Sequence, residues 1–232
     1  MNIVAIHGQM HHGSTYNITK KFIKHLSTEK TDIHEFFLPK DAPHNCIGCY
    51  TCFTKGEEQC PHADFIQPIA SALENADLII LESPCYVMGM TGQLKSFLDH
   101  LGYRWFPHRP HPKMFHKVGL VLSTAAGAGT KKVTKALSRN LFFWGVAKTF
   151  AFGKNVGAQN WETVSEKKKL KIEKEVAKKA GKIRKQLVKA KHGLKTKFMF
   201  QIMSLSQKGN DWNPTDKDHW IQNGWLEKNR PW

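Results

Sequence analysis

Four of the five cysteines of this 232-residue chain lie within a stretch of fifteen residues. Their spacing is C-x2-C-x2-C-x7-C, formed by Cys46, Cys49, Cys52 and Cys60. Four thiolates placed so closely can hold one soft metal centre. The spacing leaves three interpretations open: a [4Fe–4S] cluster, a zinc ion with four thiolate ligands, or reduced or partly oxidised thiols in an ordered loop. Structural zinc usually binds two separated C-x2-C pairs, so zinc is the weakest of the three.

A second group of candidate residues directly follows the first predicted strand. The loop His7–Thr15 (HGQMHHGST) holds glycines that let the backbone approach a ligand, and Ser14 and Thr15 can donate hydroxyls to an anion. The start of the following helix adds free amides and a positive dipole end. We expect a phosphate site here rather than an ordinary strand–helix turn. The predicted binding positions are Gly8, Gln9, His11, Gly13, Ser14 and Thr15.

Two further loops have compositions suited to a flat ligand. Ser83–His100 (SPCYVMGMTGQLKSFLDH) offers backbone polar groups beside Tyr and Met side chains, which suits a flat heteroaromatic ring or a simple packing turn. Ser123–Thr130 (STAAGAGT) has small residues that make room for a ligand or that merely begin a helix. The predicted binding positions are Pro84, Cys85, Tyr86, Val87, Met88, Gly89, Thr124, Ala125, Ala126 and Gly127. No acid–base dyad stands out, so we assign no catalytic side chain.

Alternating strands and helices are expected to position these loops. Short apolar or alternating runs predict strands at Asn2–Ile6, Asp32–Phe37, Asp77–Glu82, Lys117–Ser123 and Val146–Phe152. Helical spacing predicts helices at Thr15–Leu26, Ala63–Glu74, Thr91–Leu101, Thr130–Trp144 and Ser165–Lys191. Mostly apolar strands that alternate with helices indicate a parallel sheet covered on both faces. Right-handed crossovers then give a doubly wound α/β fold that binds ligands at the carboxyl ends of its strands, where the three loops begin.

The three loop motifs together resemble the NADPH-dependent FMN reductase family of flavodoxin-like proteins, over roughly residues 1–155. The most specific likeness lies in the second loop, and its matching positions are Pro84, Tyr86, Leu94, Lys95 and Asp99. The resemblance implies a five-stranded parallel sheet in the order 2-1-3-4-5. It also implies one FMN, with its phosphate in the first loop, its isoalloxazine ring along the second, and the third loop on the opposite side of the ring.

The first loop departs from the family pattern at two positions. Many members have a serine and an arginine where this chain has Gln9 and His11. Phosphate binding is therefore expected to depend more on backbone amides, Ser14 and Thr15. The cysteine loop, in contrast, resembles the iron–sulfur flavoprotein branch of the same group, which holds a [4Fe–4S] cluster after the second strand.

The resemblance implies an FMN-dependent oxidoreductase that accepts hydride from NAD(P)H and reduces a small acceptor such as a quinone, a flavin or a nitro compound. The alternative is an iron–sulfur flavoprotein that relays electrons between a [4Fe–4S] cluster and FMN for a redox protein partner. The resemblance also implies a homo-oligomer, a dimer or larger. The sequence names neither the acceptor nor the preferred nucleotide.

The net charge of +16 invites a nucleic-acid interpretation, but it is concentrated in one element. Residues 166–197 contain fourteen Lys and Arg against three Glu. We interpret this stretch as the solvated outer helix of the fold, whose apolar stripe (Leu170, Val176, Ile183 and Leu187) packs on the sheet. A nucleic-acid partner is not expected. A basic binding module without catalysis would explain the lysines but not the three loops and four cysteines.

The remaining residues divide the chain into two regions. We predict an FMN-binding domain over residues 1–192 and an aromatic-rich, irregular extension over residues 193–232, packed on the domain or on a partner subunit. No run of eighteen apolar residues predicts a transmembrane segment. The first residues, MNIVAIHG, lack the features of a signal peptide. We therefore expect a reducing, cytoplasmic location, in which the cysteines are not structural disulfides.

Overall fold

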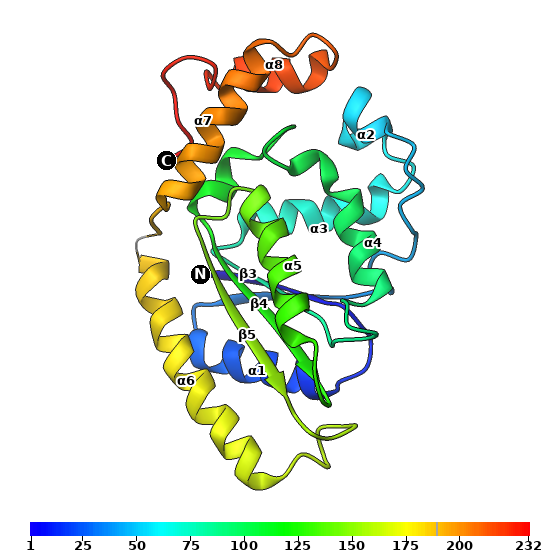
Figure 1. Cartoon of the computed structure of the whole chain (residues 1–232), viewed down its shortest axis with the longest axis vertical. Helices are drawn as coiled ribbons and strands as arrows, with labels where there is room; N and C mark the ends of the chain where they lie inside the picture. The colour runs from blue at the N-terminus through cyan, green and yellow to red at the C-terminus, as the bar shows by residue number, and fades with distance from the viewer. Residues whose placement is uncertain (189) are drawn as a thin grey trace.

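One all-parallel sheet of five strands organises the chain (Figure 1). The computed structural model describes residues 1–188 and 190–232. The strand order is β2-β1-β3-β4-β5, which confirms the doubly wound sheet and its predicted order. The strands are β1 (Asn2–His7), β2 (Asp32–Phe37), β3 (Leu78–Glu82), β4 (Val118–Ala125) and β5 (Lys148–Asn155). The carboxyl ends of β1, β4 and β5 extend beyond their predicted limits, so the loops after them begin later than expected.

Helices cover both faces of the sheet, and alternate strand residues divide between two hydrophobic clusters. Ile3 and Ala5 of β1 belong to the cluster formed with α1 and α6, whereas Val4 and Ile6 belong to the cluster formed with α3, α4 and α5. Such complete burial of consecutive residues is typical of a parallel strand. The helices are α1 (Ser14–Leu26), α3 (Ala63–Asn75), α4 (Gly92–His100), α5 (Thr130–Phe143) and α6 (Glu166–Val188).

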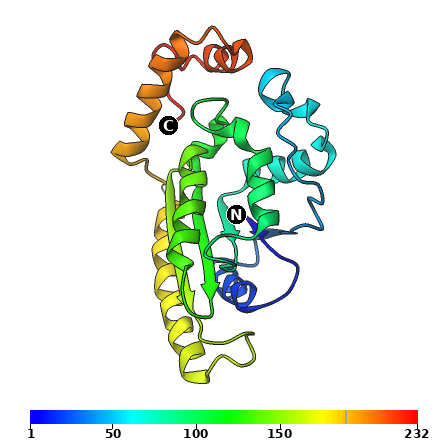
Figure 2. The ribbon, with the colours of Figure 1, turned by 45° about the vertical axis from the view of Figure 1, so that its right-hand side comes forward.

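The basic helix α6 lies along the α1 face of the sheet (Figure 2). Its buried stripe consists of Ile172, Val176, Ala180 and Ile183. The predicted stripe was therefore wrong at Leu170, whose side chain is 63% exposed, because the spacing from Ile172 sets a register that excludes it. Within the described ranges, no helix is long and apolar enough to cross a membrane.

The C-terminal extension is helical, so the prediction of an irregular segment was wrong. It contains α7 (Leu194–Lys208) and α8 (Pro214–Gln222). Phe200 of α7 and Trp220 of α8 are fully buried in a third hydrophobic cluster, which also contains Phe106, Phe115 and Trp225. The aromatic residues of the extension thus build a small core of their own against the segment between α4 and β4.

Short helical turns complete the fold at the end of the molecule opposite the carboxyl ends of the strands (Figures 1 and 2). Here α8 lies beside α2, which follows the second strand. The short elements are α2 (Thr51–Thr54), η1 (Glu57–Gln59), η2 (Gly102–Arg104) and η3 (Pro112–His116).

Candidate functional site

The three predicted loops meet at the carboxyl edge of the sheet around a cavity of about 210 Å³. The predicted residues that line it are Gln9, His11, Gly13, Ser14, Thr15, Pro84, Cys85, Tyr86, Thr124, Ala125 and Ala126. Three residues after β5 also line it and were missed: Val156, Ala158 and Gln159. A ligand in this cavity would contact loops from four strands, as expected at this edge of a doubly wound sheet.

Side-chain and backbone hydrogen bonds join the three loops to one another. The hydroxyls of Thr15 and Thr124 lie 2.7 Å apart, which connects the first loop to the third. The Tyr86 hydroxyl donates to Gln9 Oε1 at 2.9 Å, which connects the second loop to the first. The Cys85 amide donates to the Thr124 carbonyl at 2.7 Å. The cavity is therefore held by a closed ring of contacts between segments far apart in the sequence.

The first loop leads into a helix whose leading amides precede its hydrogen-bond ladder. The first helical bond of α1 runs from the Asn17 amide to the Gly13 carbonyl at 3.0 Å, so the amides of Ser14, Thr15 and Tyr16 come before it. Among the described residues, no side chain caps this end, and the Ser14 hydroxyl has no hydrogen-bond partner. Three amides, a hydroxyl and the positive end of the helix dipole together suit a phosphate group.

The second loop forms a tight turn whose tip points away from the cavity. Tyr86 and Gly89 exchange two backbone hydrogen bonds of 2.9 Å, with Val87 at φ 48° and Met88 at φ 62° between them. A β-branched residue in this region is strained, and Val87 is fully exposed. Val87, Met88 and Gly89 are not among the residues that line the cavity, and their contact with a ligand stays a prediction.

Gly8 and Gly127 also lie outside the cavity lining. A Cβ atom at Gly8 would stand 2.8 Å from the Glu82 carbonyl oxygen and 2.9 Å from Thr91 Oγ1. Gly8 therefore permits the close approach of β1 to β3, and its amide donates to the Glu82 carbonyl at 2.9 Å. Gly8 thus packs closely beneath the loop, and its contact with a ligand stays a prediction.

A buried charged group lies at the carboxyl ends of β1 and β3. The two ring nitrogens of His7 lie 2.9 Å from Glu82 Oε1 and 3.0 Å from Glu35 Oε1. Burial lowers the pKa of His7, but the hydrogen bonds to both carboxylates outweigh it, and that pKa is raised. The hydrogen bond from His7, aided by Lys20, lowers the pKa of Glu35 to about 2. Burial raises the pKa of Glu82, which is fully enclosed.

The four cysteines of the second candidate site line one cavity of about 470 Å³. The wall also includes His62, His100 and Trp212, from three separate parts of the chain. Burial, and then the nearby thiols of Cys60 and Cys46, raise the pKa of Cys52 to about 11. The donors thus lie close enough to repel one another as thiolates, and a bound cationic centre would remove that repulsion.

The donor geometry separates the metal interpretations. Over the ranges that the structure describes, the one group of three donors whose atoms all lie within 4.8 Å is Cys60, His62 and His100. The four sulfur atoms do not converge in this way, which a single zinc ion with four thiolate ligands would need. A multi-iron cluster accepts thiolates that lie further apart, because each sulfur binds a different iron. The four thiols as placed do not form a site for one zinc ion, and a [4Fe–4S] cluster held by them stays a prediction.

Helix α4 runs from beneath the first loop to the cysteine cavity. At its amino end, the Thr91 hydroxyl donates to the Gly8 carbonyl at 2.6 Å and the Thr91 amide donates to Ser83 Oγ at 3.0 Å. At its carboxyl end, His100 lines the cysteine cavity, and Ser96 Oγ accepts the Cys46 amide at 3.1 Å. A helix of nine residues is about 13 Å long. One rigid element therefore sets the separation of the two candidate sites.

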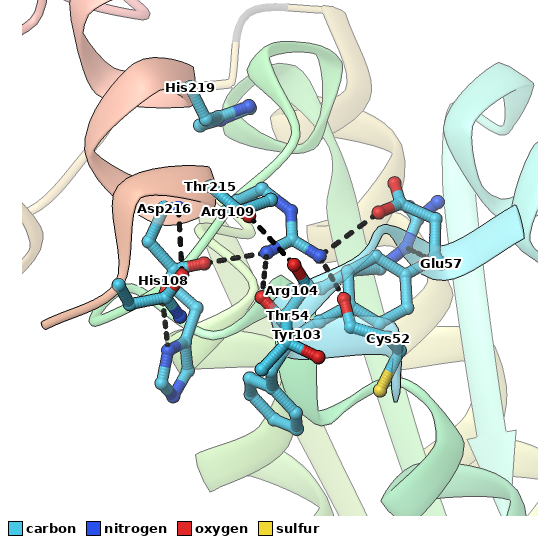
Figure 3. Close-up of polar contacts among 12 residues, drawn as sticks. Cys52, Thr54, Glu57, Tyr103, Arg104, His108, Arg109, Thr215, Asp216 and His219 are labelled. Carbon is cyan, nitrogen blue, oxygen red and sulfur yellow. Dashed lines mark hydrogen bonds and ion pairs between the residues drawn. The ribbon is translucent and has the colours of Figure 1, made fainter. Parts of the chain in front are cut away.

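A buried arginine joins the cysteine loop to the C-terminal extension (Figure 3). Arg109 donates to Asp216 Oδ1 of α8 at 2.6 Å and to the backbone carbonyl of Cys52. It also donates to the Phe53 carbonyl at 3.3 Å and to Glu57 Oε2 at 3.1 Å. Sequence reasoning did not identify this contact, because 107 residues separate Arg109 from Asp216.

The parallel sheet and the cavity at its carboxyl edge define a flavodoxin-like fold with a candidate ligand site at the usual place. The sequence model of the NADPH-dependent FMN reductases matches residues 1–160, so the chain belongs to that family. The resemblance drawn from the loop motifs is thereby confirmed. The match covers β1 to β5 but neither α7 nor α8.

Two relatives and one solved structure illustrate the similarity. An iron–sulfur flavoprotein from Archaeoglobus fulgidus is 28% identical over 136 residues, 58% of this chain and 59% of the relative. Another, from Methanocaldococcus jannaschii, is 28% identical over 144 residues, 62% of this chain and 72% of the relative. An FMN-dependent NADH-azoreductase from Bacillus anthracis, solved with FMN, shares 13% identity and a TM-score of 0.57 over 79% of this chain and 98% of its own. The azoreductase likeness shows the fold alone, and this chain spans less than two thirds of the Archaeoglobus relative.

Proposed function

We propose that FMN binds in the cavity between the three loops, with its phosphate at the amino end of α1. The observation that carries this proposal is the set of donors that precede the helical ladder: the amides of Ser14, Thr15 and Tyr16 and the Ser14 hydroxyl. Bound FMN would supply hydride and single-electron chemistry, while the protein supplies binding and orientation. We propose NAD(P)H as the hydride donor and a small quinone, flavin or nitro compound as the acceptor.

We propose a second redox centre in the cysteine cavity, a [4Fe–4S] cluster held by Cys46, Cys49, Cys52 and Cys60. Two observations support it: the four thiols line one cavity, and two relatives are iron–sulfur flavoproteins. In this alternative function the chain relays electrons between the cluster and FMN for a redox protein partner. Because α4 runs from beneath the first loop to the cysteine cavity, it would help to fix the separation of the two centres.

We also propose a homo-oligomer and a reducing, cytoplasmic location. Helix α7 leaves an apolar row exposed, with Leu194 at 86%, Phe198 at 68% and Leu205 at 59%. Exposed apolar rows of this kind are typical of contact with another subunit. All five cysteines are free thiols, as a reducing compartment would keep them.

Purification without air tests both centres at once. We expect flavin absorption bands with a broad brown shoulder, about four irons per chain, and bleaching when NADPH or NADH is mixed in a stopped-flow instrument. The Cys52→Ser variant should lose iron and the shoulder but keep FMN, because Cys52 lines only the cysteine cavity. Cys85→Ser is the matched control, because Cys85 lines the other cavity. The Cys85→Ser variant should therefore keep the iron of the protein.

The outcomes separate the two proposals. Flavin bands without iron, even after anaerobic reconstitution with iron and sulfide, would refute the electron relay through a cluster. The proposal of an FMN-dependent reductase would still stand. A protein that cannot be reconstituted with FMN would refute both. Bleaching by one nucleotide at a much greater rate than by the other would identify the direct donor.

A further inference from the structure

We propose that Arg109 and Asp216 are positioning residues for the four-cysteine loop, so that the C-terminal extension is part of the cluster site. This inference rests on the proposed [4Fe–4S] centre. The family match ends at residue 160, and α8 lies well beyond it. The extension therefore contributes lining residues and an ion pair to the cysteine cavity, whereas the four proposed cysteine ligands come from the part of the chain that the family model matches.

The first argument is the position of the Arg109 guanidinium between the loop and α8 (Figure 3). On one side it donates to the carbonyls of Cys52 and Phe53, and on the other to the fully buried carboxylate of Asp216. Arg109 is itself only 7% exposed. A displacement of the loop would leave the buried guanidinium paired with Asp216 but without its two carbonyl acceptors, so the contact restrains the Cys52 backbone.

The second argument is that α8 reaches the loop at more than one point. The Thr215 hydroxyl donates to the Thr54 carbonyl at 3.1 Å, two residues after Cys52. Trp212 and Asn213, which precede α8, line the cysteine cavity itself. The amino end of α8 thus contacts both the backbone and the open side of the loop.

The third argument is that Asp216 is held in place independently of the loop. Its Oδ2 atom lies 2.7 Å from His108 Nδ1 and accepts from Asn213 Nδ2 at 2.8 Å. Trp220 also anchors α8, by donating from Nε1 to the His108 carbonyl at 2.7 Å and by its burial in the third hydrophobic cluster. Because α8 has these other anchors, loss of the Arg109 contact should free the cysteine loop before it unfolds the extension.

The experiment compares Arg109→Met with Arg139→Gln, which alters an exposed arginine of α5 as a matched control. In the protein without cluster, Arg109→Met should raise the rate of tryptic cleavage after Lys55 and of Cys52 modification by a thiol reagent at least fivefold. After anaerobic reconstitution, its iron content should fall at least fivefold while FMN binding stays unchanged. Arg109→Lys keeps the charge without the forked geometry, so it should restore only part of the iron content.

The milder variant Thr215→Val keeps the result decisive if Arg109→Met fails to fold. It removes one loop contact and no charge, and it should speed the release of iron to a chelator two- to threefold and shift the electron spin resonance spectrum of the reduced cluster. Wild-type protein that takes up no iron would refute the cluster proposal. Wild-type protein that takes up iron, together with variants that match it in cleavage, iron content and spectrum, would refute the positioning role alone.

Discussion

The phosphate end of the FMN cavity gives the sharpest quantitative prediction. Ser14→Ala removes a hydroxyl that lines the cavity and has no partner among the residues described by the structure. A hydrogen bond to a charged group contributes about 1.5–3 kcal/mol, which converts to a roughly 10- to 100-fold weaker Kd for FMN. Binding should persist, because the amides of Ser14, Thr15 and Tyr16 remain ahead of the helical ladder.

Titration of the apoprotein with FMN and with riboflavin, followed by flavin fluorescence, measures the effect. Riboflavin lacks the phosphate, so its affinity should be the same for Ser14→Ala and the wild type. Ser71→Ala on the exposed side of α3 serves as the control variant and should change neither affinity. An equal loss for the two flavins would mean that the variant damages the ring site or the fold, and an unchanged FMN affinity would refute the assignment of the phosphate to α1.

Two further predictions concern the groups around the cavity. The pKa of Glu35 is about 2, below its ordinary 4.5, so its ion pairs stabilise the fold above pH 4.5 and lose that effect as pH falls toward 2. The contribution is about 2 kcal/mol after allowance for solvent screening, and the difference in unfolding free energy between wild type and Glu35→Gln should shrink as pH falls from 4.5 and disappear below pH 2 in urea denaturation. Val87→Asn should relieve backbone strain at φ 48° and raise stability by about 1 kcal/mol in thermal denaturation, while FMN affinity should stay unchanged because Val87 does not line the cavity; a variant no more stable than wild type would contradict the strain.

The sheet and the meeting of three loops could be predicted because both follow from short-range patterns and general topology. Buried runs such as Leu78–Glu82 alternate with helices, and right-handed crossovers bring the carboxyl ends of the strands to one edge. The missed contribution after β5 has a physical cause. Lys148–Asn155 is an edge strand with several exposed positions. Its apolar pattern stops at Phe152, so the predicted strand ended three residues before the observed one.

The helices of the extension illustrate a different limit. The sequence does contain a signal for the start of α8: Asn213 accepts the Asp216 amide as a cap, and Pro214 occupies the first helical position. Helix α7 has no such clear pattern, since apolar residues such as Leu194 and Phe200 lie on both its exposed and its buried sides.

The contact of Arg109 with Asp216 could not be predicted from the sequence. Nothing local distinguishes Asp216 from an ordinary capping residue, and its partner lies 107 residues earlier. Only the packing of the third hydrophobic cluster brings the two together. The four cysteines themselves were conspicuous, whereas the residues that hold their loop were not.

The distance along the chain between the cysteines and their anchor has a consequence for the order of assembly. Asp216 is synthesised 156 residues after Cys60, which takes roughly 8–30 s at typical translation rates. During that interval the sheet domain can fold, but the cysteine loop lacks the contact between Arg109 and Asp216. Its thiols are then exposed to oxygen and to competing metal ions. On the proposed cluster site, delivery of iron and sulfide should therefore follow the synthesis of Asp216, and a ribosome stalled before residue 216 would present the three loops complete in sequence beside a cysteine loop without its anchor.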